Sequence, residues 1–593
     1  MPSYPVHAFE ASSTASLLRP DSGLPEDSRY STGARSQVST VSNKFSLPAD
    51  PAAWGSNISA NYPESDDFLH NPDVRKGKLV DHVGSVFTSR GFANLGFLLL
   101  LCAGLLALFI GYPVLTYVSN YQSTQTALNA LGINGSGQVP EIGNFGLIDL
   151  DTPSDAYTKT SNRDGSEWQL VFSDEFNTDG RTFYPGDDPY WEAVDLHYWA
   201  TNNLEWYDPA AITTKNGSLV ITFSEKETHD LNYQGGMMAT WNKFCFTGGL
   251  FEASVMLPGI NNVVGMWPAV WAMGNLGRAG YGATLDGMWP YTYDSCDVGT
   301  APNQTKNGLP EAAAQDGGSD SNFALSYLPG QRLSRCTCPG SSHPGPMHSD
   351  GTYVGRSAPE IDMFEAQVSD EVGQVSQSAQ WAPFNDFYVW KNTSDNLIIY
   401  NSSISALNSY IGGDTQQASS VVTTTNQLCY ELSKSPCYST YGFEYKPGFD
   451  DAVSASSLDT FPVSHYSPQY ITWYSSGTPA WTLNVAGMGA DTATEISARP
   501  VPQEPMYLII NLGMSENFGE VDLEHLTFPN HLRVDYVRVY QDPNNINIGC
   551  DPTDFPTAAY INEYMEAYTN PNLTTWEDDF KQQNPKNSFV DGC

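Results

Sequence analysis

Positive charge is what this sequence has least of. Its 593 residues include 27 lysines and arginines against 66 aspartates and glutamates, for a net charge of −39. Nucleic-acid binding is therefore excluded, because phosphate contacts need clustered Lys and Arg. A nucleotide-binding fingerprint is also lacking, since neither G-x-G-x-x-G after a strand nor a P-loop occurs. A soluble acidic surface accounts for the charge. A neutral or cationic substrate, or an acidic working environment, is the alternative.

Long hydrophobic runs are absent except for one. Residues 91–118 read GFANLGFLLLLCAGLLALFIGYPVLTYV and hold no charged side chain. The apolar part, from about Leu95 to Val118, supplies the roughly 20 residues that a bilayer-spanning helix needs. A cleaved signal peptide would lie at the N-terminus rather than after 90 residues. All-round apolar character favours a membrane span over an amphipathic core helix. The run predicts a single transmembrane helix at 91–118.

The charges on either side of this run predict its orientation. No Lys or Arg follows the run until Lys159. The basic residues that precede it are Arg75, Lys76, Lys78 and Arg90. Because the positive flank faces the cytosol, we expect a single-pass type II membrane protein of the secretory pathway, in the endoplasmic reticulum, Golgi or plasma membrane. Residues 1–90 are then a disordered cytosolic tail, and residues 119–164 a luminal stalk.

The cysteines agree with this topology. Cys102 lies in the hydrophobic run, and an even number of cysteines follows it: Cys245, Cys296, Cys336, Cys338, Cys429, Cys437, Cys550 and Cys593. In an oxidising compartment these predict four disulfides, with the pairing left open. The spacing of Cys336 and Cys338 is too short for a zinc site. Six sequons after the run predict N-glycosylation, at Asn134, Asn216, Asn303, Asn392, Asn401 and Asn572.

Short stretches rich in β-branched and aromatic residues recur from about residue 165. Six of them, bounded by Gly, Pro, Asn or Ser, are typical of strands: EWQLVFSDEF, SLVITFSEK, GLFEASVMLP, QYITWYSS, MYLIINLGM and HLRVDYVRVYQ. They predict an all-β domain of two packed sheets over 165–545. Within it, the Gly-, Ser- and Pro-rich residues 275–357 predict an insert pinned by disulfides. Residues 546–593 form a C-terminal extension, with one short helix around 557–567.

The stretch PEIDMFEAQ, residues 359–367, places three carboxylates within six residues. On a regular strand, Glu360 and Asp362 share one face, but strict alternation turns Glu365 into the core. A buried unpaired carboxylate is costly, so that register is disfavoured. One extra residue, a β-bulge near Met363 or Phe364, turns Phe364 inward and Glu365 outward. The pattern therefore predicts a bulged strand with Glu, Asp and Glu in a row on one face.

Such a row suits a particular chemistry. Neighbouring carboxyls cannot all ionise freely, so one pKa rises while others fall. Retaining glycoside hydrolysis uses this, with one carboxylate as nucleophile and one protonated carboxyl as acid for the leaving oxygen. A calcium site is the chemical rival, but large apolar residues between the acids do not fit a Gly-bearing calcium loop. A solvated helix face is the structural rival, which Pro359 and the apolar interleaving disfavour.

A family resemblance joins these observations. The segment EIDMFE resembles the E-[ILV]-D-x-x-E signature of glycoside hydrolase family 16 in its bulged form. Four other segments resemble family segments and occur in the same order as in that family: GGMMATWNKFCFTGGLFEASVMLPG, GMWPAVWAMG, MYLIINLGMS and HLRVDYVRVYQ. The anchor, LPGQRLSRCTCPG and SAQWAPF make the whole chain similar to fungal type II membrane proteins associated with β-1,6-glucan synthesis. The resemblance implies a concanavalin-like β-sandwich, or jelly roll, in the lumen.

The resemblance also implies roles for individual residues. Glu360 would be the nucleophile, Asp362 its assisting acid and Glu365 the general acid/base. The resemblance also implies substrate-binding residues. On the donor side these are Asn203, Glu205 and Tyr207 of NNLEWY. Trp267 and Trp271 would line the cleft wall, and Trp473 and Trp481 would stack on acceptor sugars. Core packing is the alternative for each tryptophan. Glu175 and Asp535 would hold a structural calcium, and no other cofactor is required.

The implied activity is remodelling of cell-wall β-glucan. Attack by water on a glycosyl-enzyme would make the protein a hydrolase, and attack by a sugar hydroxyl would make it a transglycosylase, which we favour. The alternative is a non-catalytic glucan-binding lectin or a scaffold for wall-polymer assembly. Expected partners are β-glucan, the membrane through one helix and the cell-wall synthesis machinery. The intact triplet of acids favours an enzyme, since the fold alone would not decide.

Overall fold

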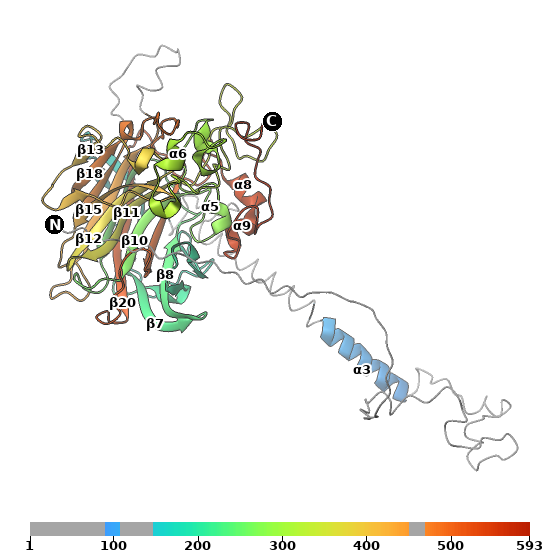
Figure 1. Cartoon of the computed structure of the whole chain (residues 1–593). Coiled ribbons are helices and arrows are strands. Elements are labelled where there is room, and N and C mark those ends of the chain that lie inside the picture. The colour runs from blue at the N-terminus through green and yellow to red at the C-terminus, as the bar shows by residue number, and fades with distance from the viewer. Residues whose placement is uncertain (1–88, 107–108, 110–145, 450–468) are drawn as a thin grey trace, which may run out of the picture. The chain divides into compact units, whose positions relative to one another are not determined.

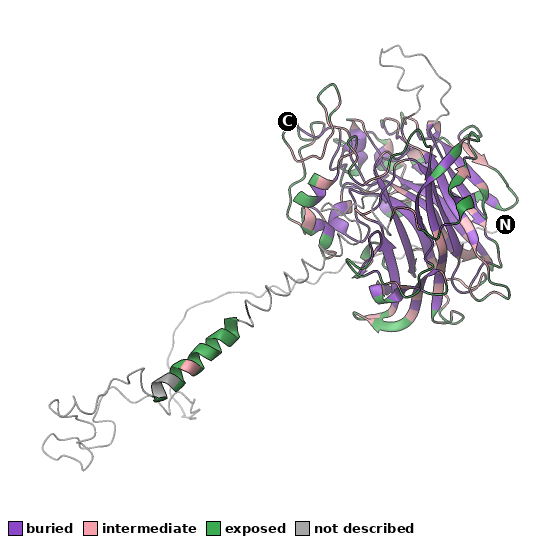
Figure 2. Cartoon of the chain, turned by 180° about the vertical axis from the view of Figure 1, so that it is seen from behind, coloured by how far each residue is buried: buried purple, intermediate pink, exposed green. Residues whose placement is uncertain are grey.

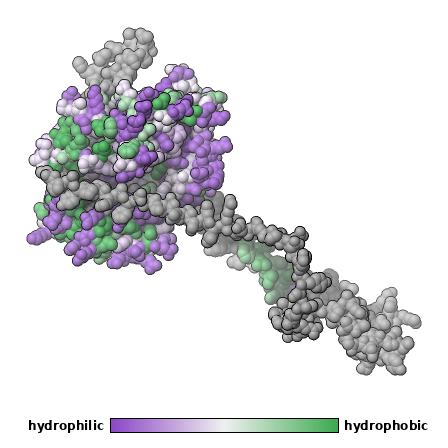
Figure 3. Space-filling model, in the orientation of Figure 1, coloured by the Kyte–Doolittle hydropathy of each residue, from purple (hydrophilic) through white to green (hydrophobic). Residues whose placement is uncertain are grey.

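A computed structural model describes residues 89–106, 109, 146–449 and 469–593, in two compact units divided at Tyr121 and Gln122. In the first unit, helix α3 covers Ser89–Leu106, its leucines are exposed, and its visible surface is hydrophobic (Figures 2 and 3). Within the described ranges, no helix has the length and apolar character needed to cross a membrane. Residues 1–88 of the predicted cytosolic tail, most of the predicted stalk and part of the predicted span lie outside them, and Ser89 and Arg90 of the predicted tail belong to α3.

Strands are the main regular structure of the second unit (Figure 1). The strands are β1 Thr158–Thr160, β2 Glu167–Asp174, β3 Glu192–Ala193, β4 Leu196–His197, β5 Glu205–Tyr207, β6 Ile212–Thr214, β7 Leu219–Thr228, β8 Leu231–Ala239, β9 Gly249–Met256, β10 Trp267–Gly274, β11 Glu360–Ser369, β12 Val372–Trp381, β13 Leu397–Ile399, β14 Ser405–Leu407, β15 Gln417–Thr424, β16 Ser439–Lys446, β17 Tyr470–Ser475, β18 Thr478–Asn484, β19 Met506–Gly513 and β20 Asn530–Gln541.

Helices are short in this unit. The α-helices are α5 Gly282–Leu285, α6 Ala312–Gln315, α8 Ala558–Glu563 and α9 Met565–Thr569. Single 3-10 turns lie at Ser154–Ala156, Trp199–Thr201, Pro209–Ala211, Val298–Thr300, Pro302–Gln304, Ser319–Ser321, Asp386–Tyr388 and Val485–Met488. The helix predicted around 557–567 corresponds to α8 and α9, which are separated at Tyr564. The six stretches predicted as strands correspond to β2, β7, β9, β17, β19 and β20.

Most of the strands form two antiparallel layers, while β4 and β5 form a small ladder in which β5 pairs parallel with β8. The front sheet has the order β3–β8–β19–β10–β11–β12–β15–β14. In the back sheet, β20 is flanked by β7 and β2 on one side and by β9, β16, β17, β18 and β13 on the other. β7 and β8 pair with each other and join the two layers at one edge. The prediction of an all-β domain with two packed sheets is confirmed.

The core lies between these two sheets. Alternate side chains of each strand point into it, as the period of two requires. Phe364 of the front sheet, for example, packs on Tyr441 of the back sheet with ring centroids 4.7 Å apart. β19 departs from this alternation, because all eight of its residues are buried. Its outer face is covered by a further layer, which explains why MYLIINLG is a continuous apolar run.

That further layer consists of the insert and the C-terminal extension. Residues 275–359, all of them described, contain no strand, and they pack with α8 and α9 into a second apolar cluster on the front sheet. α8 and α9 lie beside α5 of the insert (Figure 1). The backbone N–H of Ala283 donates to the carbonyl oxygen of Leu573 at 2.9 Å, which links the two segments directly.

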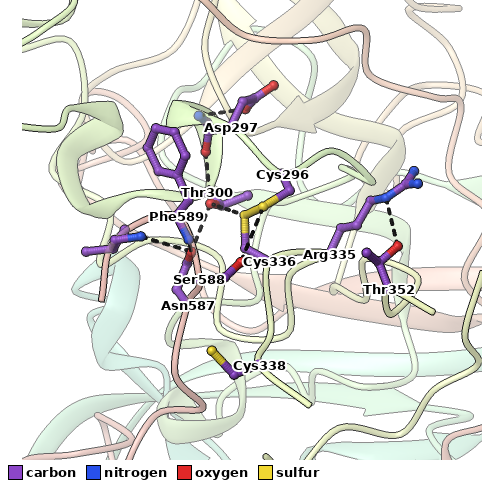
Figure 4. Close-up of a disulfide and its surroundings, with 12 residues drawn as sticks. Cys296, Asp297, Thr300, Arg335, Cys336, Cys338, Thr352, Asn587, Ser588 and Phe589 are labelled. Carbon is purple, nitrogen blue, oxygen red and sulfur yellow. Dashed lines mark hydrogen bonds between the residues drawn. A yellow bond between two sulfur atoms is a disulfide. The ribbon is translucent and has the colours of Figure 1, made fainter. Parts of the chain in front are cut away.

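The unit contains four disulfides, as the cysteine count predicted. They pair Cys245 with Cys550, Cys296 with Cys336, Cys338 with Cys593, and Cys429 with Cys437, and Cys102 is free. Around the Cys296–Cys336 bond, Asn587 Nδ2 donates to Thr300 Oγ1, so residues near the C-terminus also contact the insert (Figure 4). Three of the four bonds therefore fix the insert or the extension, and two of them connect the extension to distant parts of the unit.

Candidate active site

The site is centred on the bulge in β11. Against β12, Asp362 pairs with Ser378 and Glu365 with Ser376, so that Met363 and Phe364 together oppose one residue. The ladder with β10 shifts register at the same place. The predicted bulge is therefore confirmed. Ile361, Met363 and Phe364 are fully buried in the core, while the acids turn to the other face.

Side chains from the back sheet and β12 satisfy the backbone at this bulge. Gln377 Nε2 donates to the carbonyl oxygen of Met363 at 3.0 Å, and Trp473 Nε1 donates to that of Asp362 at 2.8 Å. Buried carbonyls that leave a regular ladder need such partners. The bulge is thus fixed by groups that are far from it in sequence, and its geometry does not depend on β11 alone.

Each of the three carboxyls has its own hydrogen-bond donors. Trp289 Nε1 donates to Glu360 Oε2 at 2.6 Å, and Trp267 Nε1 donates to Glu365 Oε1 at 3.1 Å. Asp362 is more deeply buried than either glutamate. Its Oδ2 accepts from two side chains of β12, Ser378 Oγ at 2.9 Å and Gln380 Nε2 at 3.0 Å. Two partly exposed glutamates therefore flank one buried, hydrogen-bonded aspartate.

The protonation of the three acids is shifted upward. Burial, followed by the charge of Asp362, raises the pKa of Glu360 well above its ordinary value. The same two causes raise the pKa of Glu365 to about 8. Burial raises the pKa of Asp362 to about 6, against the hydrogen bonds from Gln380 and Ser378. The site therefore retains a proton near neutral pH, which a general acid requires.

The two predicted cleft tryptophans of β10 differ in position. Trp267 lies beside Glu365, is partly exposed and stacks on Phe518 with ring centroids 4.3 Å apart, as a cleft-wall residue would. Trp271 is only 8% exposed, and its Nε1 donates to Asn511 Oδ1 at 2.8 Å beneath the insert. The structure therefore places only Trp267 where a ligand can reach it.

The other predicted tryptophans are in the core. Trp473 and Trp481 are both 0% exposed, and they stack on each other with ring centroids 4.0 Å apart. Their expected contact with acceptor sugars is corrected, because neither ring has a free face. Trp473 belongs instead to the support of the bulge through its bond to Asp362.

The predicted donor-side residues form a closed network. Asn203 Nδ2 donates to Glu205 Oε1 at 2.7 Å and to the Tyr207 hydroxyl at 3.1 Å, and the Met514 N–H donates to Glu205 Oε2 at 3.0 Å. All three predicted residues are buried, and burial raises the pKa of Glu205 to about 8. The expectation that they line the sugar site is corrected. They pack against the outer face of β19, where Gly513 approaches them so closely that a Cβ would clash with Glu205.

The pair proposed for calcium does not fit that ion. Both oxygens of Glu175 accept from the guanidinium of Arg538, at 2.9 and 2.8 Å. Asp535 accepts instead from Ser254 Oγ at 3.3 Å. Among the described residues, no group of three or more His, Cys, Asp or Glu could hold a metal ion. The guanidinium of Arg538, rather than a metal ion, satisfies the carboxylate of Glu175.

Three site residues were missed in the sequence. Trp289 comes from the Gly- and Pro-rich insert, where nothing local marked it. Tyr198 lies near the acids. Burial, followed by the charge of Glu360, raises the pKa of its hydroxyl. Tyr410 is 51% exposed, and its hydroxyl accepts from Gln416 Nε2 at 2.8 Å. Partial burial of that hydroxyl and the charge of Glu365 raise its pKa to about 12.

Most predicted glycosylation sites are accessible. Asn392 is partly exposed, and Asn134 lies outside the described residues. The exposed ones are Asn216, Asn303, Asn401 and Asn572. Their modification stays a prediction.

Comparison with known proteins agrees with the resemblance seen in the sequence. The family described as beta-glucan synthesis-associated protein SKN1/KRE6/Sbg1 matches residues 56–593. The chain is 40% identical to beta-glucan synthesis-associated protein KRE6 of Candida albicans, over 92% of this chain and 70% of that one. It is 39% identical to KRE6 of Saccharomyces cerevisiae, over 95% and 74%. A solved laminarinase catalytic domain of Thermotoga petrophila matches 64% of this chain and 99% of its own, with 19% identity and a TM-score of 0.33.

Proposed function

The chain belongs to the beta-glucan synthesis-associated SKN1/KRE6/Sbg1 family, and on that premise we propose that it is a retaining β-glucan transglycosylase or hydrolase. The observation that carries the proposal is the row of Glu360, Asp362 and Glu365 on the outer face of bulged β11. Two carboxyls with separate hydrogen-bond donors, flanking a third, supply the nucleophile and the acid of a double displacement.

The first step forms a glycosyl-enzyme. Glu360 attacks the anomeric carbon as the carboxylate, while Glu365 gives its proton to the leaving oxygen. Glu360 and Asp362 interact through a hydrogen bond. The upward shift of the Glu360 pKa places the proton of that pair on Glu360 at rest, so the proton moves to Asp362 as Glu360 attacks. Trp289 donates to Glu360 Oε2 and holds this oxygen in place.

The second step reverses the roles. Glu365, now a carboxylate, takes the proton of an incoming hydroxyl, whose oxygen attacks the anomeric carbon and releases Glu360. Water as the attacking group gives hydrolysis, and a sugar hydroxyl gives a longer or branched glucan. We favour transfer, because the two KRE6 relatives that match more than 90% of the chain are described as associated with beta-glucan synthesis. β-1,6-glucan is the polymer that the sequence resemblance implies.

We also propose that the protein is held to a membrane of the secretory pathway by residues 91–118, with the β-domain in the lumen. The uncharged run, its basic N-terminal flank and the disulfides that follow it support this. A protease-protection assay on sealed microsomes tests the orientation. Protection of residues 146–593 is expected, and their digestion without detergent would contradict it.

Product analysis tests the activity. The full-length chain, purified in detergent from a secretory host, is incubated with β-1,3- and β-1,6-gluco-oligosaccharides, and the products are measured by mass. Longer products indicate transfer, and shorter ones alone indicate hydrolysis. Glu360→Gln is the inactive variant, and Glu311→Gln, an exposed glutamate of the insert, is the matched control. Binding without turnover would favour the lectin or scaffold reading instead.

A further inference from the structure

The outer face of the front sheet differs on the two sides of β11. A glucan lying across the sheet would pass over β10, β19 and β8 on one side and over β12 and β15 on the other. On the first side, the outward side chains include Trp271 of β10, Tyr507 of β19 and Met237 of β8, and all of them are buried. They are large and mostly apolar, and another part of the chain covers them.

The covering layer is the start of the insert. The backbone N–H of Ala279 donates to the Tyr507 hydroxyl at 2.9 Å, so the insert rests directly on β19. Arg278 stands at the same place, with its guanidinium 4.4 Å from the ring of Trp241 and donating to Glu192 Oε1 at 3.0 Å. The insert also supplies Trp289, which reaches Glu360 itself. The layer therefore begins at the nucleophile and continues away from it.

The C-terminal extension backs this layer. Arg278 Nη1 donates to the carbonyl oxygen of Tyr568 at 2.7 Å, and the Tyr568 hydroxyl donates to that of Leu276 at 2.8 Å. Further out, the guanidinium carbon of Arg332 lies 3.6 Å from the ring centre of Trp576. The Cys245–Cys550 and Cys338–Cys593 bonds fix both ends of the extension. We call residues 275–289 and 558–576 together the wall. Its double layer and covalent ties make it a fixed part of the domain.

The other side of β11 is different in kind. Its floor carries small polar side chains of β12 and β15, among them Ser376 and Ser420, whose hydroxyl oxygens lie 2.9 Å apart. Tyr410 stands near Glu365 with half of its side chain exposed. The Ser376 and Ser420 side chains are buried, so it is the exposed ring of Tyr410 that can bind a sugar on this side, by stacking. A glucan can therefore extend from the acids on this side.

We propose that the wall ends the cleft beside Glu360, so that the enzyme works at the end of a glucan chain and removes or transfers a piece of fixed, short length. The inference rests on the proposed function and specifies its substrate as a chain terminus. A cleft that is open at both ends would admit internal linkages, whereas a cleft closed on one side sets how much of the sugar fits beyond the reacting bond.

A pair of substrates tests this inference in the full-length chain. One is a linear β-glucan oligosaccharide labelled at its reducing end, and the other is a cyclic β-1,3/1,6-glucan, which has no ends. The linear substrate is expected to change length by one fixed increment. The cyclic glucan should react roughly 100-fold more slowly or not at all, because it cannot place its linkage at the acids.

The outcomes separate the two proposals. Comparable turnover of the cyclic glucan, or early products cut at every internal position, would overturn end recognition and leave the glycosidase function standing. No turnover of either substrate would remove the proposed function, and end recognition with it. The variant Arg278→Ala sharpens the test, since a loosened wall should broaden the product lengths. Arg335→Ala, in the same insert but ion-paired to Asp350, is the control. A folded Arg278→Ala protein that keeps the fixed increment would contradict the role of the wall.

Discussion

Glu365 on β11 and Glu205 on β5 are two glutamates whose pKa is raised to about 8, and in both cases burial is the main cause. They differ in access. Glu365 is partly exposed, has one indole donor and shares its face with two other acids. Glu205 is fully enclosed, and both of its oxygens accept hydrogen bonds from neighbouring groups. A raised pKa therefore marks a buried carboxyl, and only its geometry and access decide whether it does chemistry.

The largest expected effect comes from removing either glutamate of the row. Glu360→Gln and Glu365→Gln should each lower turnover by roughly 10³-fold or more, as losses of essential groups do in comparable enzymes. Glu205→Gln should leave the rate within a few-fold. Initial rates on the preferred oligosaccharide measure all three. Azide should restore part of the activity of Glu365→Gln only, because a strong nucleophile needs no general base. Equal losses in all three variants would erase the distinction between the two glutamates.

The next effect concerns the tryptophans that support or line the site. Trp473→Ala should destabilise the fold by about 3–5 kcal/mol, since it leaves a cavity in the core. It also removes the donor to the carbonyl oxygen of Asp362. Trp267→Ala, at a partly exposed tryptophan beside Glu365, should cost much less stability and act mainly on KM. Urea unfolding and initial rates measure the two effects. A stable Trp473→Ala protein with weak substrate binding would favour the sugar-stacking role after all.

The pH dependence of activity reports on Glu365. Because its raised pKa keeps it protonated below about 8, acid catalysis should persist at neutral pH and decline as the pH rises through about 8. A glutamate of ordinary pKa would have lost its proton above about 4.5. The profile of kcat/KM against pH measures the alkaline limb. A decline near pH 5 would show that another group, or an unshifted Glu365, supplies the proton.

The pH dependence of stability reports on Glu205. The folded state holds its proton up to about pH 8, whereas the unfolded chain releases it from about 4.5. Folded molecules thus bind more protons in this window, so stability falls as the pH rises from about 4.5 to 8. Glu205→Gln should flatten that slope. If the side-chain amide nitrogen of the new glutamine faces the Met514 N–H, it lowers the free energy of unfolding by the same amount at every pH, so the slope is not affected. Thermal unfolding across the range measures the slopes, and identical slopes would contradict the shift.

The smallest expected effect is at Tyr410. Tyr410→Ala should raise KM several-fold for longer oligosaccharides through loss of stacking, worth roughly 1 kcal/mol. Tyr410→Phe should retain most of the affinity, since the ring remains. Tyr400→Ala, at a tyrosine of similar exposure, is the control. If Tyr410→Phe raises KM as much as Tyr410→Ala does, the hydroxyl that accepts from Gln416, rather than ring stacking, is responsible for the binding.

Local pattern in the sequence determined a great deal of this protein. The strands followed from β-branched and aromatic runs, and the bulge followed from the phase of Glu365 relative to Asp362, because side-chain alternation depends only on neighbours in the chain. The even number of cysteines implied four disulfides. The family and the three acids could be read from the order of a few motifs. These features are set over a handful of residues.

Tertiary structure alone decided which side chains a sugar can reach. Trp267 and Trp271 are four residues apart on one strand, yet only the second is covered by the insert. Trp473 contacts a carbonyl 111 positions away, and Trp289 contacts Glu360 across 71 positions. Burial depends on segments brought together from the whole chain, among them an extension whose Tyr568 contacts Arg278 of the insert across 290 positions. Such an arrangement leaves no periodic pattern in the sequence. The acids could therefore be predicted from the sequence, but the wall beside them could not.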